Sequence, residues 1–349
     1  MRVNKTYFLF LKLLVYCFSD NKESVSMMIG SSRQSETAAE LQAAEQVQGY
    51  SDQLSETYIS KDLEAAGIYL KTEIREEISS TNTLLRQYAE AGEEKDMLLI
   101  AEHQTGGRGR KGRSFFSPKG TGLYMSLLLH PKVPAGEVHM LTTLAAAATV
   151  KALEKISGQA VQIKWVNDIL VNGKKAVGIL TEASGTVTDG CFNYVIVGIG
   201  INVYEPIGGF PETIESVAGA VFPWPAVQGE KNILEEPVLE KNLRSKIAVE
   251  VIKQFMEFYR TFPEKSYLEE YRNRSYLIGK EIRVIPTEQI SNGEDRRKQA
   301  LSGTEEREET KMPVYAKVLG IDEQCRLHVK YEDGREELLS NGEVSVRER

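Results

Sequence analysis

Cysteine is scarce in this chain of 349 residues, which contains three: Cys17, Cys191 and Cys325. They lie far apart and at no spacing typical of a metal site, so the sequence offers neither a disulfide framework nor a zinc site. A few isolated thiols are typical of a reducing compartment, and we therefore expect a cytoplasmic protein.

An excess of basic residues is also missing. The sequence has 43 Lys and Arg against 50 Asp and Glu, which gives a formal net charge of -7. Binding a nucleic acid over the whole surface needs a cationic face, so the charge balance disfavours that class of function. A local basic patch is still compatible with it.

The apolar run at residues 7–18 is too short to span a membrane, and it contains Lys12. An export signal would place small residues before a cleavage site, and residues 19–24 (SDNKES) supply a poor one. We therefore favour a short docking helix over export and expect no membrane partner. A misassigned translation start is a third reading of the same run.

The composition changes along the chain and indicates three regions. Residues 1–65 form an N-terminal extension, largely polar after the apolar run, with the composition of a disordered segment. Residues 66–270 are predicted to form a mixed domain. Residues 271–349 form a small β domain, interrupted by the charged and polar loop 286–311. The predicted fold class is α+β.

Hydrophobic periodicity predicts helices at 83–91, 141–156 and 239–259, and Gly158 is expected to end the second helix. Asn172-Gly173 and Asp189-Gly190 are predicted hairpin turns, because these residue types tolerate positive φ. Short apolar runs predict strands at 97–101, 123–129, 161–166, 169–171, 176–182, 191–203, 282–285, 314–319, 327–331 and 336–339.

A loop rich in glycine and arginine lies between two predicted strands. Residues 106–113 read GGRGRKGR, so four glycines allow close approach of the backbone while four cationic side chains surround an anion. A phosphate or an adenylate is the natural guest. Basic runs also occur in disordered tails that bind nucleic acids. This one is a short loop between strands, which favours the phosphate interpretation.

A Lys-Trp-Val-Asn-Asp segment precedes the first hairpin turn. Strand alternation is expected to put Lys164, Val166 and Asp168 on one side. The hairpin would bring Lys174 and Lys175 back beside this segment. Ammonium groups next to a carboxylate suit an anionic substrate and a metal-bound nucleotide. A surface hairpin with weak salt bridges is the plainer interpretation.

Two further segments allow both a structural and a functional interpretation. Residues 197–203 read VGIGINV, and glycines inside a strand mark either a bulge or tight packing, or close approach of a ligand. They are no dinucleotide fingerprint, because the GxGxxG turn into a helix is missing. Residues 79–82 (SSTN) open a helix, where Ser and Thr are good N-caps and can also bind a polar ligand head.

Taken together and in this order, these segments resemble the biotin protein ligase family. The series GRGRKGR, KWVND and GIGIN is a much stronger signal than any one piece. The resemblance covers roughly residues 68–349 and is carried by SSTN (79–82), AEHQTGGRGRKGRSFFSP (101–118), LYMSLLL (123–129), KWVND (164–168), KKAVGIL (174–180), VGIGINV (197–203) and GEVSVR (342–347).

The resemblance implies a mixed β-sheet flanked by helices, as in class II synthetases, followed by a small SH3-like β-barrel. It also implies an enzyme that uses ATP and Mg²⁺ to form biotinyl-5'-AMP from biotin and ATP. Biotin would then pass to a specific lysine of a biotin carrier domain, of the kind found in acetyl-CoA carboxylase. Residues 66–270 would be the catalytic domain that binds biotin and ATP.

The resemblance also implies roles for single residues. Lys175, Asp168 and Arg110 match the catalytic positions, and Asp168 is the candidate metal ligand. The matches to the biotin site are Ser80, Thr81, Asn82, Gln104, Arg108, Lys175, Gly178 and Gly200. The matches to the nucleotide site are Gly107, Arg108, Gly109, Arg110, Lys111, Arg113, Phe115, Asn167 and Asn202, with Arg347 of the barrel as a weaker match.

The sequence departs from the family pattern at three places. Val166 replaces a proline, which removes no functional group. Phe115 stands where some members have tryptophan, which keeps stacking but loses an indole N–H. The insertion 286–311 is unusual and has no assigned role.

Residues 1–65 show no pair of helices with a recognition turn, so the resemblance is to a form without a DNA-binding domain, and we expect no DNA partner. Some family members dimerise, and the resemblance allows a homodimer.

Three other functions are compatible with parts of the sequence. A ligase or transferase for lipoate or octanoate would need an apolar acyl tunnel and different glycine and histidine motifs. A non-enzymatic regulator that binds nucleic acid would rest on the basic loop alone and would bind in a salt-dependent way without using ATP. An inactive biotin-binding regulator is disfavoured by the intact Lys175, Asp168 and loop arginines.

Overall fold

The computed structural model describes residues 52–206, 208–222, 242–285, 314–340 and 343–346. The apolar run at 7–18, the insertion 286–311 and Arg347 lie outside the described residues. Within the described ranges, no helix is long and apolar enough to cross a membrane.

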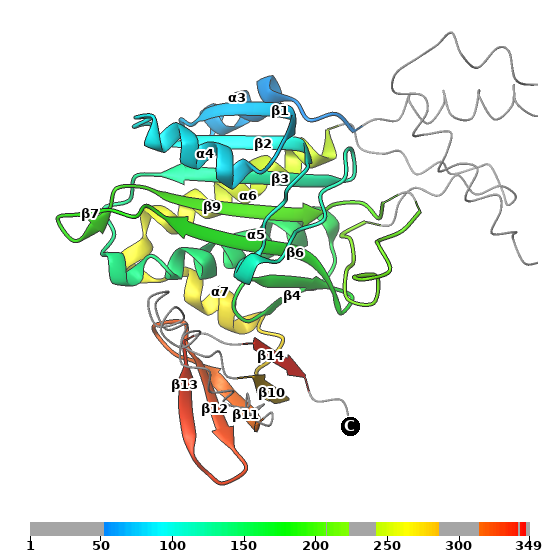
Figure 1. The fold of residues 1–349 in the computed structure, drawn as a ribbon, viewed down its shortest axis with the longest axis vertical. Helices are drawn as coiled ribbons and strands as arrows, with labels where there is room; N and C mark the ends of the chain where they lie inside the picture. Colours follow the sequence, from blue (N-terminus) through cyan, green and yellow to red (C-terminus); the bar gives the residue numbers. More distant parts are fainter. Residues whose placement is uncertain (1–51, 207, 223–241, 286–313, 341–342, 347–349) are drawn as a thin grey trace, which may run out of the picture.

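A mixed sheet of seven strands forms the larger part of the molecule (Figure 1). Its strands are β1 (Lys71–Ile78), β2 (Met97–Gln104), β3 (Gly122–Leu129), β4 (Val161–Lys164), β5 (Asp168–Val171), β6 (Lys174–Ala183) and β9 (Val195–Asn202). They are arranged in the order β1-β2-β3-β9-β6-β5-β4. β1 and β2 run parallel, and every other neighbouring pair is antiparallel. The mixed sheet expected from the family resemblance is confirmed.

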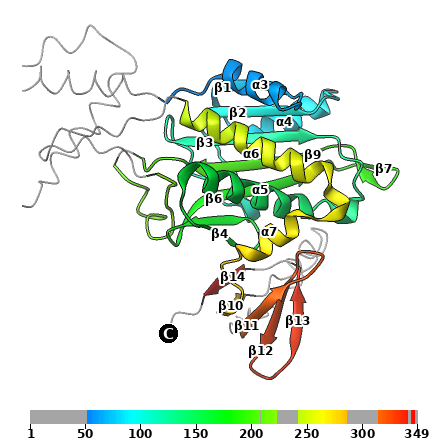
Figure 2. The same ribbon diagram turned by 180° about the vertical axis from the view of Figure 1, so that it is seen from behind.

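One face of this sheet is covered by helices (Figure 2). They are α3 (Glu56–Ala65), α5 (Met140–Ser157), α6 (Leu243–Arg260) and α7 (Tyr267–Asn273). Leu144 and Ile252 are fully buried there, as the helical periodicity predicts. Gly158 takes a left-handed φ of 67° and ends α5, which confirms its predicted role.

On the opposite face, within the described ranges, the sheet is covered by one α-helix, α4 (Thr81–Glu90), which connects the parallel strands β1 and β2 (Figure 1). Leu85 of α4 packs against Met97, Leu99, Leu128 and Ile196 in a small separate cluster. Helix α4 contacts β2, β3 and β9. It therefore leaves β6 and part of β9 available on this face for the pocket described below.

Residues 52–65, which the sequence analysis placed in the N-terminal extension, fold as part of the helical layer. Ile59 and Leu63 of α3 are buried in the main core. Arg244 of α6 is itself buried and holds this segment, because its main-chain N–H donates to the Asp52 carboxylate at 2.9 Å. Its guanidinium also pairs with Glu102 at 2.7 Å. A buried charge network of this kind leaves no trace in the periodicity of the sequence.

Five antiparallel strands form the small C-terminal domain, in the order β13-β12-β11-β10-β14. They are β10 (Glu281–Ile285), β11 (Val314–Ile321), β12 (Leu327–Tyr331), β13 (Glu336–Leu339) and β14 (Glu343–Val346). The small all-β domain is therefore confirmed. It contacts the large domain at Trp165, whose indole N–H donates to the Cys325 carbonyl at 2.9 Å.

Two of the predicted strands differ from the observed ones. The strand predicted at 161–166 ends at Lys164, and the next three residues form a tight turn into β5. Lys164 and Asp168 still share a side, but they do so as a cross-strand pair and Val166 lies in the turn. The strand predicted at 191–203 breaks into β8 (Cys191–Phe192) and β9, because β8 pairs with β7 (Val187–Thr188) in a separate hairpin.

Candidate functional site

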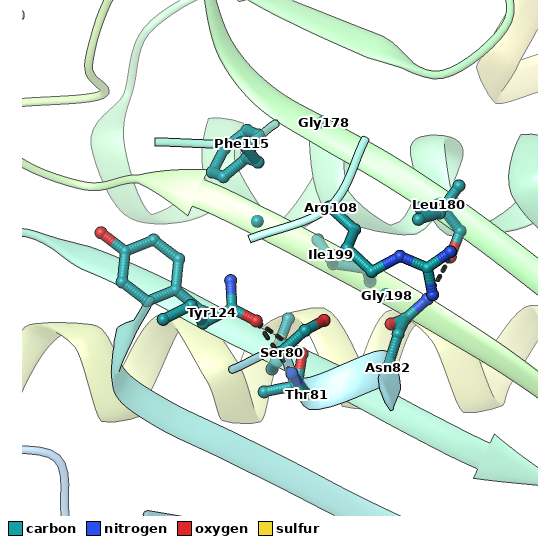
Figure 3. A pocket seen from close by; sticks show the side chains of 13 residues that line it. Ser80, Thr81, Asn82, Arg108, Phe115, Tyr124, Gly178, Leu180, Gly198 and Ile199 are labelled. Carbon is teal, nitrogen blue, oxygen red and sulfur yellow. Dashed lines mark hydrogen bonds between the residues drawn. The ribbon is translucent and has the colours of Figure 1, made fainter. Parts of the chain in front are cut away.

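The floor of a pocket lies on the face of the sheet opposite α5 and α6, where β6 and β9 present glycines (Figure 3). A Cβ at Gly200 would stand 2.7 Å from the Phe115 ring, and one at Gly178 would stand 3.1 Å from it. A Cβ at Gly198 would overlap the Asn82 side chain. These positions are therefore glycine because side chains of the protein itself, Phe115 and Asn82, pack closely against the strands, which is the structural interpretation of the motif.

Helix α4 begins at one side of this floor. Ser80 occupies its N-cap position, but its side chain makes no capping hydrogen bond. The plain N-cap interpretation of this serine is therefore not what the structure shows. The Thr81 main-chain N–H and hydroxyl both donate to Gln104 Oε1, at 2.9 and 3.2 Å. The start of α4 and the end of β2 thus present one joined polar surface to the pocket.

Ser126 of β3 is hydrogen-bonded to the side chains of Thr81 and Asn82. Its fully buried hydroxyl lies 2.6 Å from both Thr81 Oγ1 and Asn82 Oδ1. The sequence analysis missed Ser126. It is the one polar residue in the apolar strand LYMSLLL apart from the tyrosine, and alternation puts it on the pocket face, so a signal was present.

The Gly/Arg loop (residues 106–113) is held against the sheet. The main-chain N–H of Phe115 donates to the Gly107 carbonyl at 2.9 Å, and that of Gly109 donates to the Arg113 carbonyl at 2.7 Å. Lys111 takes a positive φ of 55° at the tip. This bonded, hairpin-like path is unlike a disordered basic tail, and it favours the phosphate interpretation of the loop.

Lys175 and Asp168 meet at the end of the floor nearest to Gly178. Lys175 Nζ lies 2.7 Å from Asp168 Oδ1, which confirms that the hairpin brings these two residues together. Lys174 instead points outward and donates to the Glu215 carbonyl at 3.3 Å. Of the two adjacent lysines, therefore, the hairpin directs Lys175 to the carboxylate.

Arg110 of the Gly/Arg loop reaches the same corner. Its guanidinium donates to Asn167 Oδ1 at 3.0 Å, and the Asn167 amide nitrogen donates to the Ile179 carbonyl at 3.0 Å. Side chains from the loop, the turn and β6 thus meet at one corner, through the contacts of Arg110 with Asn167 and of Lys175 with Asp168. They are Arg110, Asn167 and Lys175, and two of them are cationic.

Phe115 lies over the glycines of the floor and packs edge-on against Tyr124, with ring centroids 6.4 Å apart (Figure 3). The free volume left beside it is about 30 Å³. Burial raises the pKa of Tyr124, whose hydroxyl donates to the Pro118 carbonyl at 2.8 Å. Tyr124 is therefore a neutral wall residue. The Phe115 ring therefore covers part of the glycine floor.

Most of the predicted site residues are brought together, but not all. Asn202 lies apart from the pocket lining, because its amide donates to the Gly219 carbonyl at 2.9 Å. Lys111 and Arg113 lie on the exposed side of the loop. The predicted residues that line the pocket are Ser80, Thr81, Asn82, Gln104, Arg108, Phe115, Gly178 and Gly200.

No group of three or more His, Cys, Asp or Glu side chains that could hold a metal occurs among the described residues. Asp168 is the carboxylate at the corner of the site, beside Asn167 and Lys175. Mg²⁺ in nucleotide sites is commonly held by one or two carboxylates together with substrate phosphates. The donors present fit that arrangement and do not fit a metal cage built by the protein alone.

Family models match two parts of the chain. The model described as the biotin/lipoate A/B protein ligase family matches residues 75–202, and the biotin protein ligase C-terminal domain matches residues 310–347. The first range holds the pocket and the corner described above.

Curated relatives agree with these models. The bifunctional ligase/repressor BirA of Bacillus spizizenii is 32% identical over 279 residues, which is 78% of this chain and 75% of that protein. The biotin–[acetyl-CoA-carboxylase] ligase of Paracoccus denitrificans is 38% identical over 141 residues, which is 40% of this chain and 55% of that protein.

A solved structure shows the same fold. The biotin protein ligase from Aquifex aeolicus, in complex with biotin and ATP, aligns with a TM-score of 0.59 at 25% identity. The alignment covers 80% of this chain and 99% of that one.

Proposed function

The chain belongs to the biotin protein ligase family and is an ATP-dependent biotin ligase, and on this basis we propose which residues perform each part of the reaction. In the first half-reaction the biotin carboxylate attacks the α-phosphate of ATP, which forms biotinyl-5'-AMP and releases pyrophosphate. In the second, a lysine amine of the carrier attacks the mixed anhydride, loses a proton and releases AMP.

Lys175 is the residue that acts where charge develops. Its ammonium group is held 2.7 Å from Asp168 at the edge of the glycine floor, and this observation carries the proposal. A cation fixed in advance stabilises the negative charge on the α-phosphate as the carboxylate approaches, and it needs no reorganisation to do so. Arg110, fixed by Asn167, adds a second cation from the loop.

The polar groups at the start of α4 bind the ureido ring of biotin. Ser80, Thr81, Asn82 and Gln104 supply hydroxyl and amide groups, with the Arg108 main chain beside them. A buried ureido group needs such partners, because unpaired polar atoms are costly. The same lining suits lipoate or octanoate poorly, since an acyl chain offers it no hydrogen bonds.

The Gly/Arg loop holds the adenylate and keeps water from the anhydride. Gly107 and Gly109 bring main-chain groups close to the phosphate, while Lys111 and Arg113 add positive charge from the exposed side. Phe115 stacks near the adenine, and Asn202 stabilises the wall through Gly219.

Asp168 would hold Mg²⁺ together with the ATP phosphates. When bound, the metal neutralises phosphate charge. Asp168 also orients Lys175 through the ion pair, and it is near enough to the corner to accept a proton from the incoming lysine amine.

The acceptor we propose is a biotin carrier domain of a carboxylase. The name of the Paracoccus relative supports this class of acceptor. The cytoplasm is the proposed compartment, because Cys191 and Cys325 are free thiols.

Intact-mass spectrometry of an apo carrier domain, incubated with the full chain, biotin and Mg-ATP, tests the proposal. We expect a mass increase of one biotin that requires ATP. Parallel reactions with lipoate and octanoate should give no increase. A carrier that gains mass from lipoate or octanoate and not from biotin would contradict the proposed substrate assignment.

A further inference from the structure

Glu182 of β6 is a charged residue at the edge of the pocket that has no part in the reaction as proposed. Its carboxylate accepts hydrogen bonds from Arg86 at 2.7 Å and from Asn82 at 2.9 Å, both on α4. It also pairs with Arg108 of the Gly/Arg loop at 3.1 Å. We propose that Glu182 is a positioning residue that fastens the Gly/Arg loop to α4 and so retains biotinyl-adenylate.

The pair between Arg108 and Glu182 has the geometry of a two-point contact. Nη1 of Arg108 lies 3.2 Å from one carboxylate oxygen, and Nη2 lies 3.1 Å from the other. The Glu182 side chain is 17% exposed and the Arg108 side chain 40%, so the carboxylate is shielded while water partly screens the guanidinium. In Figure 3 the Arg108 guanidinium lies beside Asn82 and Leu180, away from Phe115.

In this orientation the side chain and the main chain of Arg108 make different contacts. Its side chain is committed to Glu182 and β6, and its main chain remains with the loop at the pocket wall. Breaking the side-chain contact would therefore loosen the loop at Arg108 without removing a group proposed to touch the ligand, while the bonds of Arg110 and Phe115 remain.

Glu182 is also part of a continuous chain of hydrogen-bonded polar groups that runs alongside the pocket. Asn82 is hydrogen-bonded to both Glu182 and Ser126. Thr81 is hydrogen-bonded to both Ser126 and Gln104. The Gln104 amide then donates to Ser117 Oγ at 3.0 Å, and Ser117 Oγ donates to the Phe115 carbonyl at 2.9 Å. The chain begins at Arg108 and ends at Phe115, so it anchors both sides of the loop to the residues proposed to bind biotin.

The consequence is a link between two parts of the site. Biotin groups bound at Thr81, Asn82 and Gln104 would steady the same network that holds the loop closed over the adenylate. This inference rests on the proposed function. It predicts that a change at Glu182 raises the rate of release of biotinyl-adenylate.

The test uses the full chain loaded with biotinyl-adenylate and measures its release after dilution. Glu182→Gln keeps the shape of the side chain but removes the charge that the arginine fork needs. We expect release about tenfold faster, which corresponds to about 1.4 kcal/mol. Arg86→Gln is the matched control, because Arg86 pairs with the same carboxylate but does not contact the loop. It should change release less than about twofold, well below a tenfold effect.

Arg108→Lys keeps the positive charge and loses the fork, so it should also speed release. In the double variant the two effects should not add, since they remove one contact. Arg108→Lys also carries the test if Glu182→Gln does not fold, as thermal unfolding would show. Unchanged release in these variants, additive effects, or equal effects of Arg86→Gln and Glu182→Gln would overturn the inference. Failure of the native chain to form the adenylate would instead overturn the proposed function.

Discussion

The two faces of the seven-stranded sheet differ in the side chains that they present. The face under α5 and α6 is lined by buried aliphatic side chains of the strands, such as Val177, Val197 and Ile201. The opposite face has a small apolar cluster under α4, and beyond it the pocket has glycines and polar side chains in the alternate positions of the same strands. In β9, for example, Val197 and Ile199 point to the helices, while Gly198 and Gly200 point to the pocket.

This difference separates stability from function within single strands. Burial of aliphatic side chains on the helical face supplies most of the hydrophobic free energy of folding. The glycine face gives up that contribution, and the space is taken by Asn82 and the Phe115 ring. Substitutions on the two faces should therefore affect different measurements.

The largest effect is expected on the pocket face at Lys175. Lys175→Ala should lower the rate of adenylate formation by roughly 100- to 1000-fold, since one fixed charge-stabilising group is lost. Pyrophosphate release measures it. Lys174→Ala is the matched control, because Lys174 bonds the Glu215 carbonyl outside the site. Equal losses in both variants, or near-normal turnover of Lys175→Ala, would remove Lys175 from the mechanism.

On the helical face, Ile252→Ala should lower the free energy of unfolding by about 2–5 kcal/mol, because it leaves a cavity in a packed core. The KM for biotin of the folded protein should stay unchanged. Denaturant titration and steady-state kinetics check the two parts. Val217→Ala removes the same kind of group at an exposed site and should cost less than about 0.5 kcal/mol. A changed biotin KM in Ile252→Ala would contradict the claim that the helical face contributes to stability and not to binding.

Gly200→Ala, unlike Ile252→Ala, should change the biotin KM more than the free energy of unfolding. The added methyl group would stand 2.7 Å from the Phe115 ring and would narrow the floor. We expect roughly a tenfold rise in the biotin KM, about 1.4 kcal/mol. Gly185→Ala is the control, because no atom lies near its Cβ position. A normal KM in Gly200→Ala would mean that the ligand does not use this floor.

The smallest effect is expected for Ser126→Ala. It deprives Thr81 and Asn82 of a shared hydrogen-bond partner, at a cost of about 1 kcal/mol. That corresponds to roughly a fivefold weaker affinity for biotin, measured by calorimetry. An affinity equal to that of the native chain would show that Ser126 does not help to arrange the biotin site.

Periodicity predicted the helical face well, since the range given for α5 differs from the observed one by a single residue at each end. The turn at Asn172-Gly173 was also predicted, because these residue types tolerate positive φ. The structure confirms it, since both residues take positive φ there. By contrast, the sequence analysis missed the edge strand β1. Its side chains alternate weakly, and its pairing with β2 comes from tertiary structure rather than from local pattern.

The same limit applies to the site. Lys175 could be placed beside Asp168 because a two-residue turn fixes the register of a hairpin. Glu182 and Arg108 are 74 residues apart, and no local rule connects them. The turn at Trp165 was also missed, because its contact with Cys325 depends on how the two domains meet.

Amide hydrogen exchange, with and without biotin and Mg-ATP, tests the account most directly. Ligand binding should protect amides in residues 80–82, 104–116 and 175–178, which surround the glycine floor, and should leave those of α5 and α6 unchanged. Protection spread evenly over both faces, or confined to the helical face, would contradict the assignment of binding to the glycine face of the sheet.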